Sequence, residues 1–160
     1  MPYRYARRVQ FAETDQAGIV HFSWYFRYME EAEHALWRAA GLSIAPADRV
    51  VVFPRVAASF EYVAPLRFED ECEVEIGIDT ISRRSIRYAC TIRRSDTTIA
   101  TGSMTVACAT NMPGEALRGT DIPADIASRL APYANAAPSE RSERTAHGST
   151  LTDSPLRSHN

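Results

Sequence analysis

The sequence predicts an α+β domain in which an antiparallel sheet of about five strands wraps around one long central helix. Two patterns of side chains indicate this fold class. Apolar residues recur every three to four positions between residues 22 and 40, which is the period of an amphipathic helix. From residue 50 onward, apolar and polar residues alternate in short runs with short breaks, which is typical of antiparallel hairpins. The economical packing for these elements is a sheet that curls around the apolar face of the helix.

The first element is predicted to be a short strand over residues 3–11, with mixed faces. A turn at Gly18 separates this strand from the helix. Ser23 can cap the start of the helix, and Gly41 stands where a helix commonly ends. The apolar face predicted for the helix is unusually aromatic and consists of Phe22, Tyr25, Phe26, Met29, Ala32, Leu36 and Ala40.

Three alternating runs, residues 56–62, 72–78 and 86–93, predict strands with one buried face. A longer strand of small and β-branched residues is predicted over residues 98–110. A second, shorter helix is predicted over residues 123–133. We therefore expect one domain over residues 1–134. The segment 135–160 contains only Leu151 and Leu156 as large hydrophobes, and we expect it to form a disordered tail.

The composition of the 160-residue chain argues against several classes of function. Its net charge of −2 gives no overall attraction to nucleic acid or to an anionic membrane, and no segment approaches the length of a membrane span. The three cysteines, Cys72, Cys90 and Cys108, fit neither a disulfide framework nor a metal-binding spacing. We expect them to be small buried hydrophobes in a reducing cytoplasm, and we expect no metal or redox cofactor.

The most specific signal is the stretch ETDQAGIVHFSWYFRYMEEA at residues 13–32. On spacing alone, an aspartate directly ahead of a helix most commonly caps a turn or the helix. As a whole, however, the stretch resembles the 4-hydroxybenzoyl-CoA thioesterase family of hot-dog proteins, which includes the acyl-CoA thioesterases associated with the Tol–Pal system. With weaker matches further on, the resemblance covers roughly residues 5–123. The positions that match the family pattern here are Asp15, Gly18, Ile19, Val20, Tyr25 and Glu30.

The resemblance implies a hot-dog fold and the hydrolysis of an acyl-CoA thioester to a carboxylic acid and CoA. Asp15 would be the catalytic carboxylate, acting either as a nucleophile or as a general base. The backbone N–H of Phe22, at the start of the helix, would stabilise the oxyanion that forms on the thioester carbonyl. Because the CoA thiolate is a stable leaving group, no strong general acid is required.

Other residues are candidates for smaller parts in the site. Several relatives carry a histidine one position later, where this chain has Phe22. By this resemblance His21 would touch substrate or assist proton transfer; alternatively, it is simply a polar residue at the helix start. Arg83, Arg84 and Ser85 occupy a hairpin turn that is basic in relatives and contacts CoA there; a solvated polar turn is the alternative. Glu30 is the rival to Asp15, because another hot-dog branch uses a helix glutamate as its catalytic carboxylate.

Two other functions stay open. One is a dehydratase or hydratase on the same fold, although the chain lacks the histidine motif of those enzymes. The other is a non-catalytic module that binds acyl-CoA or acyl-carrier protein. The resemblance also implies a homodimer or homotetramer with the active site between two protomers. It does not identify the acyl group, since Trp24, Tyr25 and Phe26 either line a pocket for an aryl group or fill the core.

Overall fold

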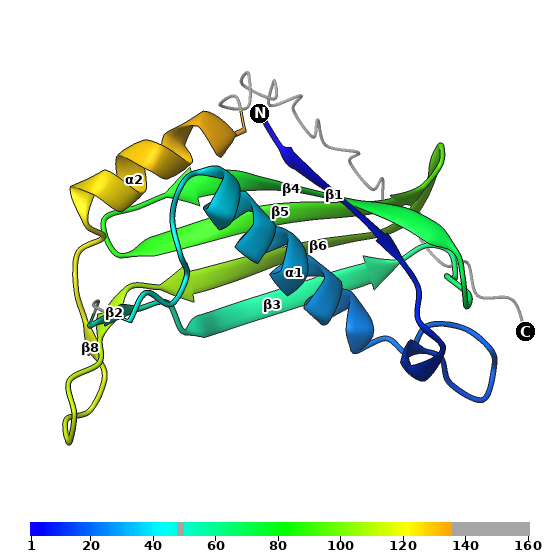
Figure 1. Cartoon of the computed structure of the whole chain (residues 1–160), viewed down its shortest axis with the longest axis horizontal. Helices are drawn as coiled ribbons and strands as arrows, with labels where there is room; N and C mark the ends of the chain where they lie inside the picture. Colours follow the sequence, from blue (N-terminus) through cyan, green and yellow to red (C-terminus); the bar gives the residue numbers. More distant parts are fainter. Residues whose placement is uncertain (48–49, 136–160) are drawn as a thin grey trace, which may run out of the picture.

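The computed structural model describes residues 1–47 and 50–135. Its main feature is an antiparallel five-stranded sheet with the strand order β1-β4-β5-β6-β3. A long helix, α1 (Trp24–Ala39), lies across one face of this sheet (Figure 1). The α+β hot-dog arrangement expected from the sequence is therefore confirmed. The five strands are β1 (Tyr3–Arg8), β3 (Arg55–Tyr62), β4 (Glu71–Ile81), β5 (Ser85–Arg94) and β6 (Thr97–Ala107).

A second, three-stranded sheet was not anticipated. The strand expected over residues 98–110 is interrupted at Cys108, which belongs to neither β6 nor the short strand after it. The N–H of Cys108 still donates to the carbonyl of Arg84 at 2.8 Å, in the register of the first sheet, whereas its carbonyl accepts the N–H of Thr120 at 2.9 Å. The expectation of one continuous strand is therefore wrong in its last residues. The piece after the break joins a small sheet with the order β2-β7-β8. Its strands are β2 (Val51–Val52), β7 (Ala109–Thr110) and β8 (Arg118–Gly119).

The first strand and the second helix differ little from expectation. β1 ends at Arg8 instead of residue 11, because a turn of 3-10 helix, η1 (Phe11–Glu13), follows it. The second helix is confirmed as α2 (Ala124–Leu130), which continues into a 3-10 turn, η2 (Ala131–Tyr133).

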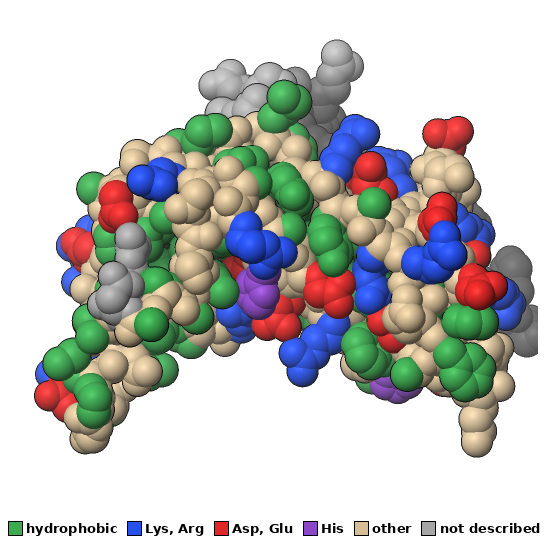
Figure 2. Space-filling view, in the orientation of Figure 1, with side chains coloured by type: hydrophobic (Ala, Val, Ile, Leu, Met, Phe, Trp, Pro, Cys, Tyr) green, Lys and Arg blue, Asp and Glu red, His purple; other side chains and the backbone are tan. Residues whose placement is uncertain are grey.

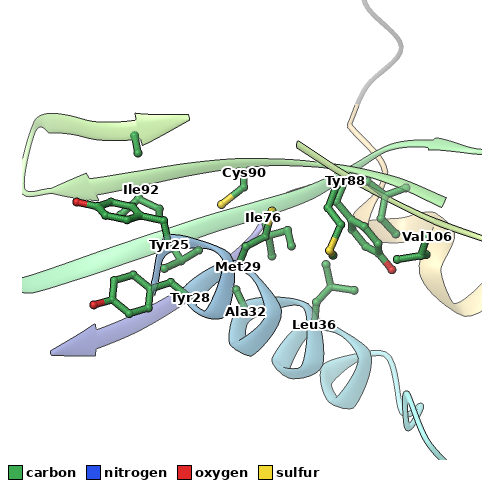
Figure 3. Packing of buried hydrophobic residues seen from close by; sticks show 14 of the residues in the cluster. Tyr25, Tyr28, Met29, Ala32, Leu36, Ile76, Tyr88, Cys90, Ile92 and Val106 are labelled. Carbon is green, nitrogen blue, oxygen red and sulfur yellow. The ribbon is translucent and has the colours of Figure 1, made fainter. Parts of the chain in front are cut away.

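The core lies between α1 and the sheet (Figure 3). Side chains from α1, among them Met29, Ala32 and Leu36, face Ile76 and Cys90 from the neighbouring strands. The buried face of α1 is wider than the expected stripe, because four further residues of the helix are also buried. Conversely, one residue of that stripe lies outside the helix and is 61% exposed. The four additional buried residues are Tyr28, Glu33, Ala35 and Trp37, and the exposed one is Phe22.

Of the two caps expected for α1, the one at the C-terminal end is formed and the one at the N-terminal end is not. Gly41 adopts a φ of 70° just after the last turn, as expected for a residue that ends a helix. Ser23 does occupy the N-cap position, but its side chain forms no capping hydrogen bond to the helix. The Ser23 hydroxyl lies instead 2.8 Å from Nδ1 of His21, so the expected Ser23 cap is not formed.

Strand β3 does not bury the face that its alternating sequence predicted. Seven of its eight residues are exposed, and only Phe60 is partly buried, against Tyr25 and Phe26 of α1. β3 stands at one end of the strand order, so it pairs only with β6. An edge strand with this exposure leaves a row of backbone groups without a strand partner in the single chain.

The remaining expectations concern the cysteines, the membrane and the tail. Cys72, Cys90 and Cys108 are free and buried, as the sequence predicted. In the part of the chain that the structure describes, no helix has the length and apolar character needed to cross a bilayer. The tail expected over residues 135–160 lies, apart from Asn135, outside the described residues.

Candidate active site

A pocket of about 400 Å³ opens at the N-terminal end of α1. The loop before the helix, the first turn of the helix and the segment after β3 form its walls. Figure 2 shows hydrophobic side chains gathered at this end of the molecule, at the lower right. Asp15 is the one charged residue among those that line the pocket, and aromatic side chains make up much of the rest. The aromatic lining residues are Phe22, Tyr25 and Tyr62.

Asp15 begins a tight hairpin that holds it at the pocket. Its N–H donates to the carbonyl of Ile19, and its own carbonyl accepts from the N–H of Gly18, both at 2.9 Å. Gly18 has a φ of 72°. Residues with a Cβ atom are strained in this conformation, which explains why a glycine stands at this position. The Oδ1 atom of Asp15 accepts the N–H of Ala17 at 2.8 Å. Within the described residues no donor reaches Oδ2, so one oxygen of this exposed carboxylate is available for chemistry.

The backbone around Phe22 presents a free donor next to that carboxylate. In the described residues the N–H of Phe22 has no hydrogen-bond acceptor, whereas its carbonyl accepts the hydroxyl of Tyr62 at 3.0 Å. Phe22 directly precedes Ser23, the N-cap of α1, so the free N–H lies at the positive end of the helix dipole. Asp15 and Phe22 line the same pocket, so the structure brings these two predicted site residues together.

His21 is exposed and stands beside Phe22, with the ring centroids 4.5 Å apart. Its Nδ1 is engaged with Ser23, from which both the hydroxyl, at 2.8 Å, and the N–H, at 3.4 Å, approach it. His21 is not among the residues that line the pocket. Its contacts are those of a polar residue at the start of a helix.

Tyr62 is a pocket residue that the sequence analysis did not single out. Its ring packs edge-on against Tyr25 at 4.9 Å, and its hydroxyl fixes the carbonyl of Phe22. Burial raises the pKa of both tyrosines, so each hydroxyl is held in its neutral, donating form. The only sequence signal for Tyr62 was its place at the end of an aromatic strand shortly before Pro65.

A buried carboxylate, that of Glu13, lies next to the Asp15 hairpin and was also missed. It accepts two hydrogen bonds from the guanidinium of Arg7, at 2.7 and 2.9 Å, one from the Tyr28 hydroxyl at 2.6 Å and one from the N–H of Gln10 at 2.9 Å. Burial alone would raise the pKa of Glu13, but these hydrogen bonds from Arg7, Tyr28 and Gln10 hold it below its usual range. Glu13 is therefore ionised, with Arg7 as its counter-ion.

Arg83, Arg84 and Ser85 do not belong to this pocket in the same chain. Arg83 and Arg84 lie in the turn between β4 and β5, and Ser85 begins β5. Arg84 Nε donates to Asp121 at 2.8 Å, and the Ser85 and Ser82 hydroxyls are 2.6 Å apart. This turn is at the Arg55 end of β3, whereas the pocket is at its other end. The strand has eight residues, so the two ends are roughly 25 Å apart at about 3.3 Å per residue.

A second charged cluster surrounds the middle of α1, where Figure 2 shows acidic and basic side chains together. Glu33 is fully buried and forms an ion pair with Arg55, which also lies 3.5 Å from Glu30. Glu30 pairs in addition with Arg27 at 3.0 Å. The rival carboxylate Glu30 is thus engaged with two arginines, and it does not line the pocket that holds Asp15.

Comparisons with known proteins identify the family and the fold of the chain. The family model of the thioesterase superfamily matches residues 17–101. One relative is a protein of Aquifex aeolicus to which an esterase activity is assigned by inference. It is 38% identical to this chain over 101 residues, which cover 62% of this chain and 79% of that protein. A 1,4-dihydroxy-2-naphthoyl-CoA hydrolase of Synechococcus elongatus is 28% identical over 109 residues, 66% of this chain and 80% of that protein. The fold matches that of a 4-hydroxybenzoyl-CoA thioesterase mutant in complex with 4-hydroxybenzoyl-CoA, with a TM-score of 0.73, 23% identity, and coverage of 81% of this chain and 98% of that one.

Proposed function

The chain belongs to the thioesterase superfamily, and on this premise we propose that it hydrolyses an acyl-CoA thioester to a carboxylic acid and free CoA. The family resemblance drawn from the Asp15 motif is confirmed by these comparisons. The observation that carries the proposal is one pocket that holds both a carboxylate with an unbonded oxygen, from Asp15, and a free backbone donor, from Phe22.

Asp15 acts as the nucleophile or as the general base in the proposed reaction. Its carboxylate either adds to the thioester carbon and forms an acyl anhydride, or removes a proton from a water molecule that adds instead. In the first case water then hydrolyses the anhydride and regenerates the carboxylate. In both cases the C–S bond breaks as the tetrahedral intermediate collapses, and the electron pair leaves with the CoA sulfur.

The Phe22 N–H stabilises the oxyanion of that intermediate. A donor at the N-terminus of α1 gains from the partial positive charge there, and the apolar pocket strengthens the interaction by excluding water. Tyr62 supports this donor, because its hydroxyl fixes the Phe22 carbonyl and so limits rotation of the backbone at this residue. The aromatic side chains of the pocket accommodate the acyl group.

A second copy of the chain completes the site in this proposal. The free edge of β3 is covered when two copies pair antiparallel through that strand, in a homodimer that can associate further into a tetramer. Antiparallel pairing sets the Arg55 end of one β3 beside the Tyr62 end of the other. The β4–β5 turn lies at the Arg55 end, so Arg83 and Arg84 of one copy approach the pocket of the other and bind the CoA phosphates there.

The test is thiol release from a panel of acyl-CoA substrates with aromatic and aliphatic acyl groups. We expect turnover by the wild-type protein, and a fall in kcat by orders of magnitude in Asp15→Asn, which keeps the shape but removes the nucleophile or base. Glu30→Gln, the matched control on α1, should keep most of the activity. Tight binding without turnover would instead identify a binding module, and near wild-type activity of Asp15→Asn would remove Asp15 from the mechanism.

A further inference from the structure

We infer that Glu13 is a positioning residue for the proposed hydrolysis, which holds Asp15 and the Phe22 N–H in their mutual arrangement without lining the pocket itself. The inference rests on the proposed function and extends it to the buried layer beneath the site. Glu13 is 3% exposed and stands two residues before Asp15. A charged group is rarely buried to this extent unless its partners fix it.

The side chain of Glu13 is anchored in two elements of the core. Arg7 reaches it from β1 and Tyr28 from α1, and both donate hydrogen bonds to it. Arg7 is itself fixed, since its guanidinium lies 3.8 Å from the centre of the Tyr28 ring and its Nε donates to Glu31 at 3.0 Å. The Glu13 carboxylate therefore joins the first strand to the helix.

The backbone of Glu13 is bonded to the segment that presents the oxyanion donor. Its carbonyl accepts the N–H of His21 at 2.9 Å, and the next peptide group along the chain carries the N–H of Phe22. Two residues further into the hairpin, the N–H of Asp15 donates to Ile19. Glu13 thus stands at the base of one hairpin, with the catalytic carboxylate on one arm and the oxyanion donor just beyond the other.

Loosening this anchor should affect catalysis more than substrate binding. The attack requires the carboxylate and the donor at fixed positions around one carbonyl group, and a misplacement of about 1 Å can lower a rate by about 100-fold. The acyl group contacts the apolar walls of the pocket in the ground state and in the transition state alike. Loss of the anchor therefore lowers kcat and leaves the affinity for substrate largely unchanged.

The test compares Glu13→Gln with Glu31→Gln. Glu13→Gln replaces an acceptor oxygen with an amide that turns a donor toward Arg7, whereas Glu31→Gln removes a charge from the same arginine without touching the hairpin. We expect kcat to fall about 100-fold in Glu13→Gln and to stay within twofold of wild type in Glu31→Gln. The Kd of a non-hydrolysable acyl-CoA thioether should be the same in both. If Glu13→Gln kept wild-type kcat while Asp15→Asn was inactive, the inference would be overturned and the proposed function would stand.

A second readout does not depend on activity. Hydrogen exchange of the His21 and Asp15 amides should accelerate in Glu13→Gln but not in Glu31→Gln, while the amides of β5 keep their protection in both. Unchanged exchange at the hairpin would overturn the inference even if no substrate were found. If Glu13→Gln does not fold, Tyr28→Phe removes a single donor from Glu13. In that variant we expect a loss of about tenfold in kcat with unchanged Kd, and equal losses in kcat and affinity would contradict a positioning role.

Discussion

Replacement of Glu33 by glutamine should stabilise the protein at high pH, although it removes a buried ion pair. Glu33 has no exposed surface, and burial raises its pKa to about 7 although Arg55 and the Tyr88 hydroxyl act in the opposite direction. Glu30 adds a like charge nearby and raises the pKa further. The Oε1 atom of Glu33 accepts no hydrogen bond in the described part of the chain. Arg55 satisfies the charge only in part.

The magnitude follows from the shift in pKa. A value of about 7 against an ordinary 4.5 is a difference of about 2.5 pH units, and each unit corresponds to about 1.4 kcal/mol. Because the folded pKa of Glu33 is the higher one, its contribution to stability is fully present below pH 4.5 and is lost as the pH rises to about 7. Above pH 7 the ionised carboxylate therefore destabilises the fold by about 3 kcal/mol relative to the neutral acid.

Urea unfolding of Glu33→Gln and wild type at pH 5, 6, 7 and 8 measures this effect. Glutamine resembles the protonated acid in size and charge, so we expect similar free energies of unfolding at pH 5. At pH 8 we expect the variant to be more stable by up to about 3 kcal/mol. Arg55 keeps Glu30 as a partner in the variant. Glu71→Gln, at an exposed position, is the control for a general effect of charge. A difference between Glu33→Gln and wild type that stays constant from pH 5 to pH 8 would refute the reasoning.

Three further predictions concern the site and the tail. Tyr62→Phe removes the hydrogen bond to the Phe22 carbonyl, and steady-state kinetics should show kcat reduced by about tenfold with KM little changed; an unchanged kcat would mean that the hydroxyl does not support the donor. Replacing Arg83 and Arg84 together with alanine should raise KM for acyl-CoA far more than it lowers kcat, and much less for a pantetheine thioester without nucleotide phosphates; equal effects on both substrates would assign these arginines to the fold. Truncation after Asn135 should leave the melting temperature and the activity nearly unchanged, because residues 136–160 contain few large hydrophobes, and a loss of either in calorimetry or thiol release would show that the segment contributes.

The fold could be predicted from the sequence because its elements are regular. Alternation in β4 and β5 and the helical period of α1 each report a side-chain pattern that one buried face imposes. The same rule failed for β3, whose alternation predicted a buried face that the single chain leaves exposed. A sequence pattern records that a face is suited to burial, but it does not distinguish burial within the chain from burial against another copy.

Only part of the candidate site could be predicted from such sequence patterns. Asp15 and Phe22 were found through a motif resemblance, since the spacing of Asp15 alone suits a turn equally well. Glu13 and Glu33 were missed because a charged residue is normally assigned to the surface. The partner that allows Glu33 to be buried, Arg55, is 22 residues away, so no local pattern reveals it. Likewise, the sequence correctly placed Arg83 in a hairpin, but the end of the sheet that this hairpin occupies depends on strand register.

Because all three cysteines are buried, the protein's own thiols should give no signal in the thiol-release assay of its proposed activity. Burial raises the pKa of Cys72 to about 11 and that of Cys90 to about 12, and it raises the pKa of Cys108 as well. At neutral pH these side chains are protonated and shielded, so a disulfide reagent that detects free CoA should not react with the native fold. After global unfolding all three thiols become reactive. The rate at which such a reagent labels the protein without substrate therefore reports how often the core opens, and each preparation carries its own probe of unfolding.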